Sequence, residues 1–216
     1  MAIRQLEQTH ETKDVLLALA RSIQERDIIT YEHSRRVAVY ALRLARRLGW
    51  ERADAYSLAL AALVHDLGKT WIANDILNKL GKLSPEERRT MERHPVIGAR
   101  ILIGYELPTF YVNTVLYHHE AWDGHGYPSG IQEEQIPLSA RILSVADVYD
   151  VLTSERPYKE PLSDEVARER LLQDAGTSFD PAIVRAFVAL LDTTPNFKLP
   201  QRVCALPKKD SLLNAW

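Results

Sequence analysis

The sequence predicts an all-α protein that folds as a single-domain helical bundle. Apolar residues recur at spacings of three and four along most of the chain, which is the period of an amphipathic helix. No segment shows a convincing alternation of apolar and polar residues of the kind that half-buried strands show. The length of 216 residues is enough for one sizeable hydrophobic core.

The first three helices are predicted from apolar stripes and from residues that end helices. The stripe of the first helix, over about residues 5–26, consists of Val15, Leu16, Leu19 and Ile23. A second helix is predicted to follow Thr30 and to end at Gly49, since glycine readily adopts the left-handed conformation that closes helices. A third is predicted over residues 52–66, stopped by Gly68. It is apolar almost all round near its end and should be central.

Later helices are marked by prolines and capping residues. Ser84 has the character of an N-cap, followed by Pro85 and two acidic residues in the first turn. That helix should end near His94, because Pro95 disfavours helical backbone at the residue before it. Further helices are predicted over residues 95–103, 108–119, 139–154, 163–175 and 181–191. Residues 120–137 are predicted to form a long loop, and loops of this length are often functional.

Bulk properties limit the class of protein. We expect an N-terminal helix (1–26) that is a linker or a bundle element, a main domain (27–192) and an irregular, proline-containing tail (193–216). The net charge of −2 argues against binding to long nucleic acid. The single cysteine, Cys204, excludes an internal disulfide and favours a reducing compartment. The longest strongly apolar run, 58–64, is too short to span a membrane, so a cytoplasmic protein is expected.

Histidines and aspartates on the inner faces of the predicted helices indicate a metal site. His33 continues the apolar stripe of Val37 and Ala41, so its side chain should point inward. The same reasoning applies to further residues on other helices, namely His65, His94, His118, His119 and Asp147. A shared metal centre would satisfy all of these buried polar groups, and imidazole with carboxylate suits Fe, Mn, Zn or Ni. Asp66, adjacent to His65, could bridge two ions.

Each of these residues also has a structural interpretation. A single inward histidine is more often a hydrogen-bonded core residue than a ligand, and Asp147 alone could pair with Arg141. His10 and His125 are interpreted as ordinary surface or loop residues. It is the coincidence of several inward ligands on separate helices that favours a metal site.

The chain resembles the HD-GYP branch of the HD phosphohydrolase superfamily over roughly residues 14–191. The resemblance rests on segments that occur in a fixed order: HDLGK at 65–69, HP at 94–95, HHEAWDGHGYPSG at 118–130, IPL at 136–138 and RILSVADVYDVLTSERPYK at 141–159. The loop motif is far more specific than the HD pair alone. The resemblance implies a bundle of the HD-domain type with an extended loop near the metals, and a catalytic domain over residues 27–192.

The resemblance further implies a metal-dependent phosphodiesterase of bacterial signalling. It would hydrolyse cyclic di-GMP to pGpG, and to GMP if cleavage repeats, by means of a metal-bridging hydroxide. Two divalent ions, iron or manganese, are expected. The ligands of one would be His33, His65, Asp66 and Asp147, and those of the other would be Asp66, His94, His118 and His119. Members with three metals have a glutamate where this chain has Ile29, so a third ion would need another acid such as Glu25 or Glu120.

The resemblance also assigns catalytic and substrate-binding positions. Asp66 and Lys69 are the expected catalytic residues. The expected substrate contacts are Lys69, Tyr127, Asp150, Arg156 and Lys159, and the loop signature is Gly124, Gly126, Tyr127 and Pro128. Alternatives are a solvated position for Lys69, a ligand-orienting role for Asp150 and a loop that merely packs.

Two other functions stay open. The chain could be a catalytically silent module that binds cyclic di-GMP, or a diguanylate cyclase domain, without turnover. It could also be an HD phosphohydrolase that acts on another nucleotide, including a hybrid cyclic dinucleotide. The retained ligands favour an enzyme. The N-terminal helix is compatible with a homodimer, and no membrane partner is expected.

Overall fold

The computed structural model describes residues 2–79, 81–155 and 160–194, with side chains from residue 10 onward, and confirms an all-helical fold. The elements in order are α1 (Ala2–Arg26), α2 (Ile28–Arg47), α3 (Arg52–Leu63), η1 (Leu67–Trp71), α4 (Asn74–Leu77), α5 (Pro85–Met91), α6 (His94–Gly104), α7 (Thr109–Tyr117), η2 (Glu133–Gln135), α8 (Leu138–Thr153), α9 (Asp164–Gln173) and α10 (Pro181–Thr193). Within these residues the only β-type pairing is an isolated bridge between Ala175 and Phe179. The predicted tail beyond residue 194 lies outside the described part of the chain.

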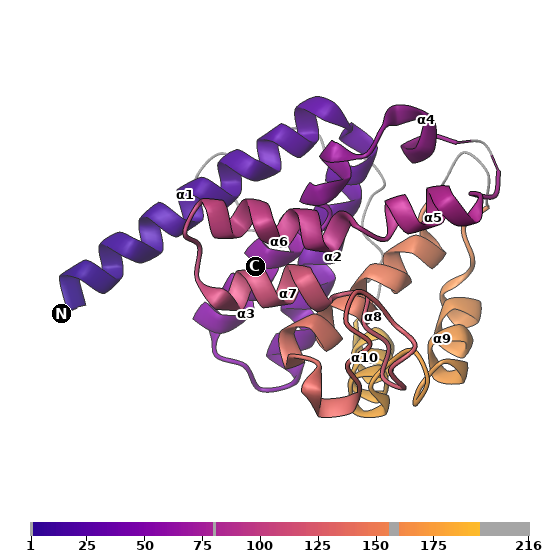
Figure 1. Cartoon of the computed structure of the whole chain (residues 1–216). Coiled ribbons are helices and arrows are strands. Elements are labelled where there is room, and N and C mark those ends of the chain that lie inside the picture. Colours follow the sequence, from indigo (N-terminus) through magenta and orange to yellow (C-terminus); the bar gives the residue numbers. More distant parts are fainter. Residues whose placement is uncertain (1, 80, 156–159, 195–216) are drawn as a thin grey trace.

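Helix α3 lies between two hydrophobic clusters. One cluster joins α2, α3, α8 and the two following helices, α9 and α10, and the other joins α1, α3, η1, α6 and α7. All residues from Leu58 to Leu63 are buried, which confirms the prediction of a central helix that is apolar on every side. Figure 1 shows the N-terminal turns of α1 extending beyond the body of the bundle, with α9 on the opposite side and α10 at the bottom of the view.

The second half of α1 belongs to the bundle core. Its buried residues, which pack in the same cluster as α6 and α7, are Leu16, Leu19, Ala20 and Ile23. The last turn of α1 also contacts the segment after η1, because the Arg26 guanidinium donates to the carbonyl of Ile72 at 3.3 Å. None of the described helices combines the length and the apolar character that crossing a membrane requires.

Helix α2 begins earlier than predicted. Its N-cap is Asp27, whose carboxylate accepts hydrogen bonds from the backbone N–H groups of Ile29 and Thr30. An aspartate cap of this kind satisfies N–H groups that have no partner inside the helix. Thr30 therefore lies inside the first turn, where its hydroxyl also donates to Asp27. The predicted end is confirmed, since Gly49 follows the helix with a φ of +87°.

Three predictions, at the HD pair, at Gly68 and at His94, were wrong. Helix α3 ends at Leu63, so His65 and Asp66 lie in the turn that leads into η1 rather than on the helix. Gly68 does not stop α3. It lies in η1, where an added Cβ would stand 2.0 Å from the carbonyl oxygen of His94, and so allows η1 to approach α6 closely. His94 does not end α5 but begins α6, with Pro95 in the first turn, where proline is well tolerated.

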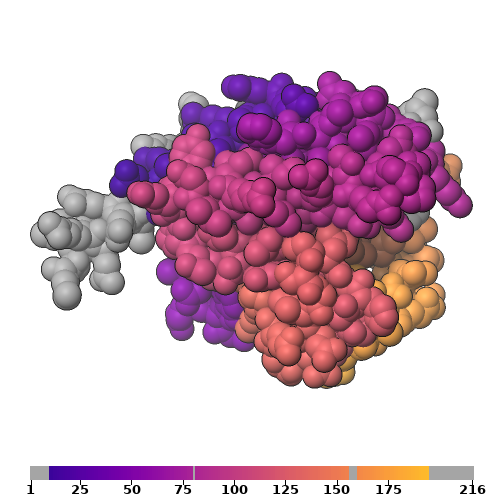
Figure 2. Space-filling view, viewed as in Figure 1, coloured from indigo at the N-terminus to yellow at the C-terminus, as the bar shows by residue number. Residues whose placement is uncertain are grey.

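The loop after α7 is held to the body by backbone hydrogen bonds. Trp122 and Asp123 donate to the carbonyls of Ser178 and Thr177, just before α10. The loop contains the short helix η2, which was not predicted. In the space-filling view the chain that follows α7 forms the lower front of the molecule (Figure 2). The predicted N-cap at Ser84 is confirmed, because its hydroxyl accepts from the backbone N–H of Glu87 and the Glu87 carboxylate accepts from that of Ser84.

Candidate metal centre

The fold gathers the predicted ligands in its interior from five places along the chain. They come from α2, the turn before η1, the start of α6, the end of α7 and α8. Six of them are buried, namely His33, His65, Asp66, His94, His118 and Asp147, and His119 is partly buried. The predicted inward direction is therefore confirmed for helix residues such as His33 and Asp147, and it also holds for His65, which lies in a turn rather than on a helix face.

One group of ligand atoms is formed by His33, His65 and Asp66, each of which offers an atom within 4.8 Å of the others. Asp147 adjoins this group. Its Oδ1 lies 3.0 Å from His33 Nε2 and 4.0 Å from His65 Nε2. Imidazole nitrogens and carboxylate oxygens thus face a common point between α2, α8 and the turn before η1.

A second group is formed by His94, His118 and His119, whose ligand atoms also lie within 4.8 Å of one another. The Nε2 atoms of His94 and His118 are 3.4 Å apart. Each ring has its Nδ1 near a backbone carbonyl, 2.9 Å from Met91 O and 2.7 Å from Val115 O. In the neutral rings Nδ1 therefore carries the hydrogen, and two Nε2 lone pairs face each other, an arrangement that a cation between them would stabilise.

Asp66 lies between the two groups. Its Oδ1 is 3.3 Å from His94 Nε2, while its Oδ2 is 3.5 Å from His65 Nε2 and 4.0 Å from His33 Nε2. One carboxylate thus presents a different oxygen to each group. Lys69 adds a positive charge on the outer side, with Nζ 2.6 Å from Asp66 Oδ2.

Two atoms at this centre are buried without any hydrogen-bond partner, His65 Nε2 and Asp66 Oδ1. His65 Nδ1 lies 2.7 Å from the carbonyl of Ala62, so the neutral ring turns its Nε2 lone pair toward the cluster. A buried polar atom without a partner costs about 1–3 kcal/mol. Divalent transition ions, which accept imidazole and carboxylate ligands, fit both unpartnered atoms and the donor set.

The surroundings hold most of the ligands in the protonation state that metals require. Burial lowers the pKa of His94 to about 3 and that of His119 to about 4, and it holds the pKa of His118 well below its ordinary value. Burial alone would raise the pKa of Asp66, but the neighbouring His65 and Lys69 keep it well below its usual range. Neutral imidazoles therefore face an ionised carboxylate at neutral pH.

His33 differs from the other histidines. Burial opposes its charged form, but hydrogen bonds with Asp147 and Asp150 raise its pKa to about 9. In turn, burial alone would raise the pKa of Asp147, but the hydrogen bond from His33 and the neighbouring histidines together hold it below its usual range. In the metal-free protein His33 is therefore protonated at neutral pH, and a metal ion that binds its Nε2 must displace a proton.

The positions considered for a third ion do not form a further cluster. Ile29 lies in the first turn of α2 and is 62% exposed, and Glu25 is exposed on α1. Both carboxylate oxygens of Glu120 accept backbone hydrogen bonds, from Ser129 at 2.7 Å and from Gly130 at 3.0 Å. Among the described residues, only the two groups above bring three or more possible metal ligands within 4.8 Å of one another.

The loop signature packs against the second group. The ring of Tyr127 stacks on that of His119, with centroids 4.9 Å apart and 30° between the planes. Gly124 has a φ of +85°, and a Cβ on Gly126 would stand 2.1 Å from the backbone nitrogen of Ala121. Both glycines are therefore required by the backbone. Glu120, which was considered only as a metal ligand, is the residue that ties the end of this loop to its start.

The remaining predicted contacts have different positions. Asp150 is fully buried and pairs with His33 and Arg36, which favours the ligand-orienting role over a substrate contact. Arg36 was missed, although its place three residues after His33 puts it on the same face of α2. Arg156 and Lys159 lie outside the described residues.

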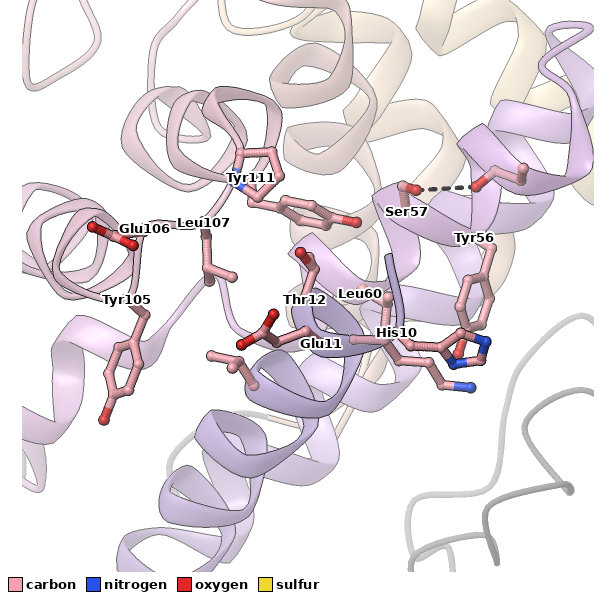
Figure 3. Close-up of a pocket in the computed structure, with 14 residues that line it drawn as sticks. His10, Glu11, Thr12, Tyr56, Ser57, Leu60, Tyr105, Glu106, Leu107 and Tyr111 are labelled. Atoms are coloured by element: carbon pink, nitrogen blue, oxygen red, sulfur yellow. Dashed lines mark hydrogen bonds between the residues drawn. The ribbon is translucent and has the colours of Figure 1, made fainter. Parts of the chain in front are cut away.

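A large cavity lies away from the metal centre. It has a volume of about 720 Å³ and is bounded by α1, α3 and the α6–α7 turn. Figure 3 shows the ring of Tyr111 pointing toward Ser57 of α3. None of the predicted metal ligands is among its lining residues. This cavity therefore does not mark the metal centre, which is recognised by its chemistry.

Comparisons with known proteins agree with this geometry. Residues 18–183 match the HD domain family. The chain is 38% identical over 179 residues to a cyclic di-GMP phosphodiesterase of Thermotoga maritima, an alignment that covers 82% of this chain and 49% of that protein. It is also 38% identical over 175 residues to the 3′3′-cGAMP-specific phosphodiesterase 2 of Vibrio cholerae, with coverage of 80% and 34%.

The fold is shared with solved structures. A cyclic GMP-AMP-specific phosphodiesterase of V. cholerae superposes with a TM-score of 0.63 at 21% sequence identity, covering 86% of this chain and 49% of that one. At this identity the likeness concerns the fold alone. The chain spans half or less of the length of the curated relatives named here.

Proposed function

The chain belongs to the HD domain family and to its HD-GYP branch, and on this premise we propose that it is a metal-dependent phosphodiesterase that hydrolyses cyclic di-GMP. The observation that carries the proposal is the position of Asp66, whose two oxygens face two separate groups of buried ligands. A carboxylate in this position could bind two ions close enough together to act on one phosphoryl group.

Two ions, iron or manganese, would occupy the centre. The residues that would hold the first ion are His33, His65, Asp66 and Asp147, and those that would hold the second are Asp66, His94, His118 and His119. Support comes from the unpartnered atoms of His65 and Asp66 and from the facing lone pairs of His94 and His118. Ile29 on the surface of α2 supports two ions rather than three.

Hydrolysis breaks one phosphodiester bond of the ring. A water oxygen forms a bond to phosphorus, the bond from phosphorus to the ribose 3′ oxygen breaks, and that oxygen takes a proton, which yields linear pGpG; a second cleavage would yield GMP. When bound, the ions would activate water and offset the negative charge that develops on the phosphoryl group.

The chain's own residues would position the substrate. Lys69, partly buried beside Asp66, is a compact positive charge within reach of a phosphate oxygen. Tyr127 stacked on His119 would form part of the wall against which the dinucleotide lies. Arg156 and Lys159 remain proposed substrate contacts on the strength of the sequence motif alone.

A hybrid dinucleotide is the second candidate substrate. It is favoured by the V. cholerae relative named for 3′3′-cGAMP, which is as similar to this chain as the relative named for cyclic di-GMP. The choice between them would depend on contacts to one base, since the two dinucleotides share the same phosphate and ribose groups.

The test is turnover by protein purified without oxygen and loaded with Fe²⁺ or Mn²⁺. Cyclic di-GMP and 3′3′-cGAMP are supplied separately, and products are separated by chromatography. We expect linear product from at least one substrate, and near-complete loss in Asp66→Asn and His119→Ala. His10→Ala, which removes an exposed histidine from α1, is the matched control and should retain turnover. Full turnover by both ligand variants would refute the proposal, whereas binding without turnover by the metal-loaded protein would identify a silent binding module.

A further inference from the structure

We propose that Arg36 and Asp150 form a buried support that orients the ring of His33 for metal binding. Both would be positioning residues, acting on the metal through His33 rather than touching substrate. The inference rests on the metal centre of the proposed function, but not on which dinucleotide is cleaved or on whether it is cleaved.

The contacts leave little freedom for the His33 ring. Asp150 Oδ2 lies 2.7 Å from His33 Nδ1. The guanidinium of Arg36 donates to the same carboxylate twice, from Nε to Oδ1 at 2.7 Å and from Nη2 to Oδ2 at 2.9 Å. The exposed fractions are 6% for His33, 6% for Arg36 and 0% for Asp150. Both oxygens of Asp150 are therefore occupied inside the protein, and neither is available to a substrate.

The arrangement follows from the register of two packed helices. His33 and Arg36 are three residues apart on α2, and Asp147 and Asp150 are three residues apart on α8. Residues at this spacing lie one turn apart on the same helix face. The first member of each pair is a predicted ligand, with His33 Nε2 3.0 Å from Asp147 Oδ1. The second members, Arg36 and Asp150, pair with each other one turn further along. The packing of α2 against α8 therefore aligns both the ligands and the residues that support them.

His33 needs this support because of its place within a helix. The other buried histidines have their Nδ1 atoms near backbone carbonyls three residues earlier, those of Ala62, Met91 and Val115. These carbonyls lie in the last turns of α3, α5 and α7, where helix carbonyls have no partner inside the helix.

His33, in contrast, lies well inside α2, where the preceding carbonyls accept helical hydrogen bonds. An acceptor for its Nδ1–H must therefore come from another element, and Asp150 on α8 supplies it. With Nδ1 held as the donor to Asp150, Nε2 faces Asp147 and Asp66 and is the nitrogen that would bind a metal ion.

Arg36 makes the support possible. An ionised carboxylate at 0% exposure is unfavourable without a charged partner. The two parallel hydrogen bonds from Arg36 supply that charge and fix the plane of the carboxylate. A lysine would retain the charge but not the two-pronged contact.

The test measures Mn²⁺ binding to metal-depleted protein by isothermal titration calorimetry. Wild-type protein should bind two ions, and His33→Ala identifies the binding step that depends on this site. We expect Asp150→Asn to weaken that step by about 10- to 100-fold and to leave the other step unchanged, as is usual for groups that orient a metal ligand. Arg36→Met should act in the same direction, and Arg36→Lys should cause a smaller loss.

Asp180→Asn is the matched control. Asp180 is also a buried aspartate (7% exposed), and it is paired with Arg141 at 2.7 Å outside the metal cluster. Its variant should lower thermal stability without weakening either Mn²⁺ step. Wild-type affinity at both steps in Asp150→Asn would overturn the inference. Should that variant not fold, Arg36→Lys carries the test, and an unchanged His33-dependent step there would overturn the role of the two-pronged contact.

The outcomes also separate this inference from the proposed function. Wild-type protein that binds two Mn²⁺ ions but cleaves no cyclic dinucleotide would refute the proposed activity, while the comparison among variants would still decide the role of Arg36 and Asp150. Wild-type protein that binds no Mn²⁺ would refute the metal centre and this inference with it.

Discussion

The carboxylate of Glu120 is predicted to hold the loop that carries Tyr127 in place. Glu120 is 4% exposed and accepts from the backbone N–H groups of Ser129 at 2.7 Å and Gly130 at 3.0 Å. The change Glu120→Gln keeps the size of the side chain. It retains one carbonyl oxygen, but it turns an NH₂ group toward the second backbone N–H, so one hydrogen bond is lost and two donors face each other.

The expected cost can be worked out from these contacts. A hydrogen bond to a charged group contributes about 1.5–3 kcal/mol. Ser129 and Gly130 are exposed residues, so water can partly replace the lost acceptor, and the lower end of the range, about 1.5 kcal/mol, applies. Such a change makes local opening of the loop about tenfold more frequent. If opening of the loop is coupled to global unfolding, the melting temperature falls by about 3–6 °C for a chain of this size.

Hydrogen–deuterium exchange measured on peptides from the 118–137 segment checks this prediction. Glu120→Gln should raise exchange there about tenfold, as estimated above for the lost acceptor, and leave the peptides of α10 unchanged. Glu134→Gln, an exposed acidic residue in the same loop, is the control and should exchange like wild type. Equal exchange and equal melting temperature for Glu120→Gln and wild type would show that the two hydrogen bonds do not hold the loop.

Further predictions concern the ligands and their surroundings. Gly68→Ala places a Cβ 2.0 Å from the carbonyl oxygen of His94, so it should lower the melting temperature and weaken Mn²⁺ binding; a variant with wild-type values would contradict the close approach of η1 and α6. In metal-depleted protein, the pKa values of about 3 for His94 and about 4 for His119 lie below the ordinary value of 6.5. Between pH 4 and pH 6.5 these two histidines therefore bind more protons in the unfolded chain than in the folded one, and the unfolding free energy should decrease as pH falls through this range. Urea titrations at pH 7 and pH 5 measure the unfolding free energy, and His119→Asn should make its decrease smaller. The pKa of His33 is raised to about 9, so Mn²⁺ binding at pH 7 should release a proton, which calorimetry in two buffers of different ionisation enthalpy detects; equal apparent enthalpies would contradict it. Mn²⁺ at 100 times its dissociation constant should raise the unfolding free energy by about 2.7 kcal/mol per site, and removal of the metal by a chelator should reverse the gain.

Patterns that repeat along the sequence predicted the architecture and the inward direction of the candidate ligands. Apolar residues at helical spacing located the long helices, and a polar residue on an apolar stripe, such as His33 or Asp147, was correctly predicted to point inward. The short elements η1, α4 and η2 were missed because three to five residues are too few to show a helical period. The start of α2 was misplaced because Asp27 and Thr30 are both residues that cap helices, and only the folded backbone distinguishes them.

Pairings between distant residues could not be predicted in the same way. Arg36 and Asp150 are 114 positions apart, and nothing in either helix alone shows that their side chains meet. Glu120 was considered as a metal ligand because of its type and place, whereas its partners are backbone groups of the loop. Backbone donors leave no trace in the sequence, so such a role becomes visible only in three dimensions.

The position of α3 between two hydrophobic clusters has a thermodynamic consequence. The buried residues of α3 are divided between the two clusters, with Leu58 and Ala62 in one and Leu60 and Ala61 in the other. If one cluster lost its packing, α3 would move or unfold, and the other cluster would lose its packing as well. The described bundle should therefore unfold in one cooperative, two-state transition, with equal calorimetric and van't Hoff enthalpies, rather than as two subdomains that melt in sequence.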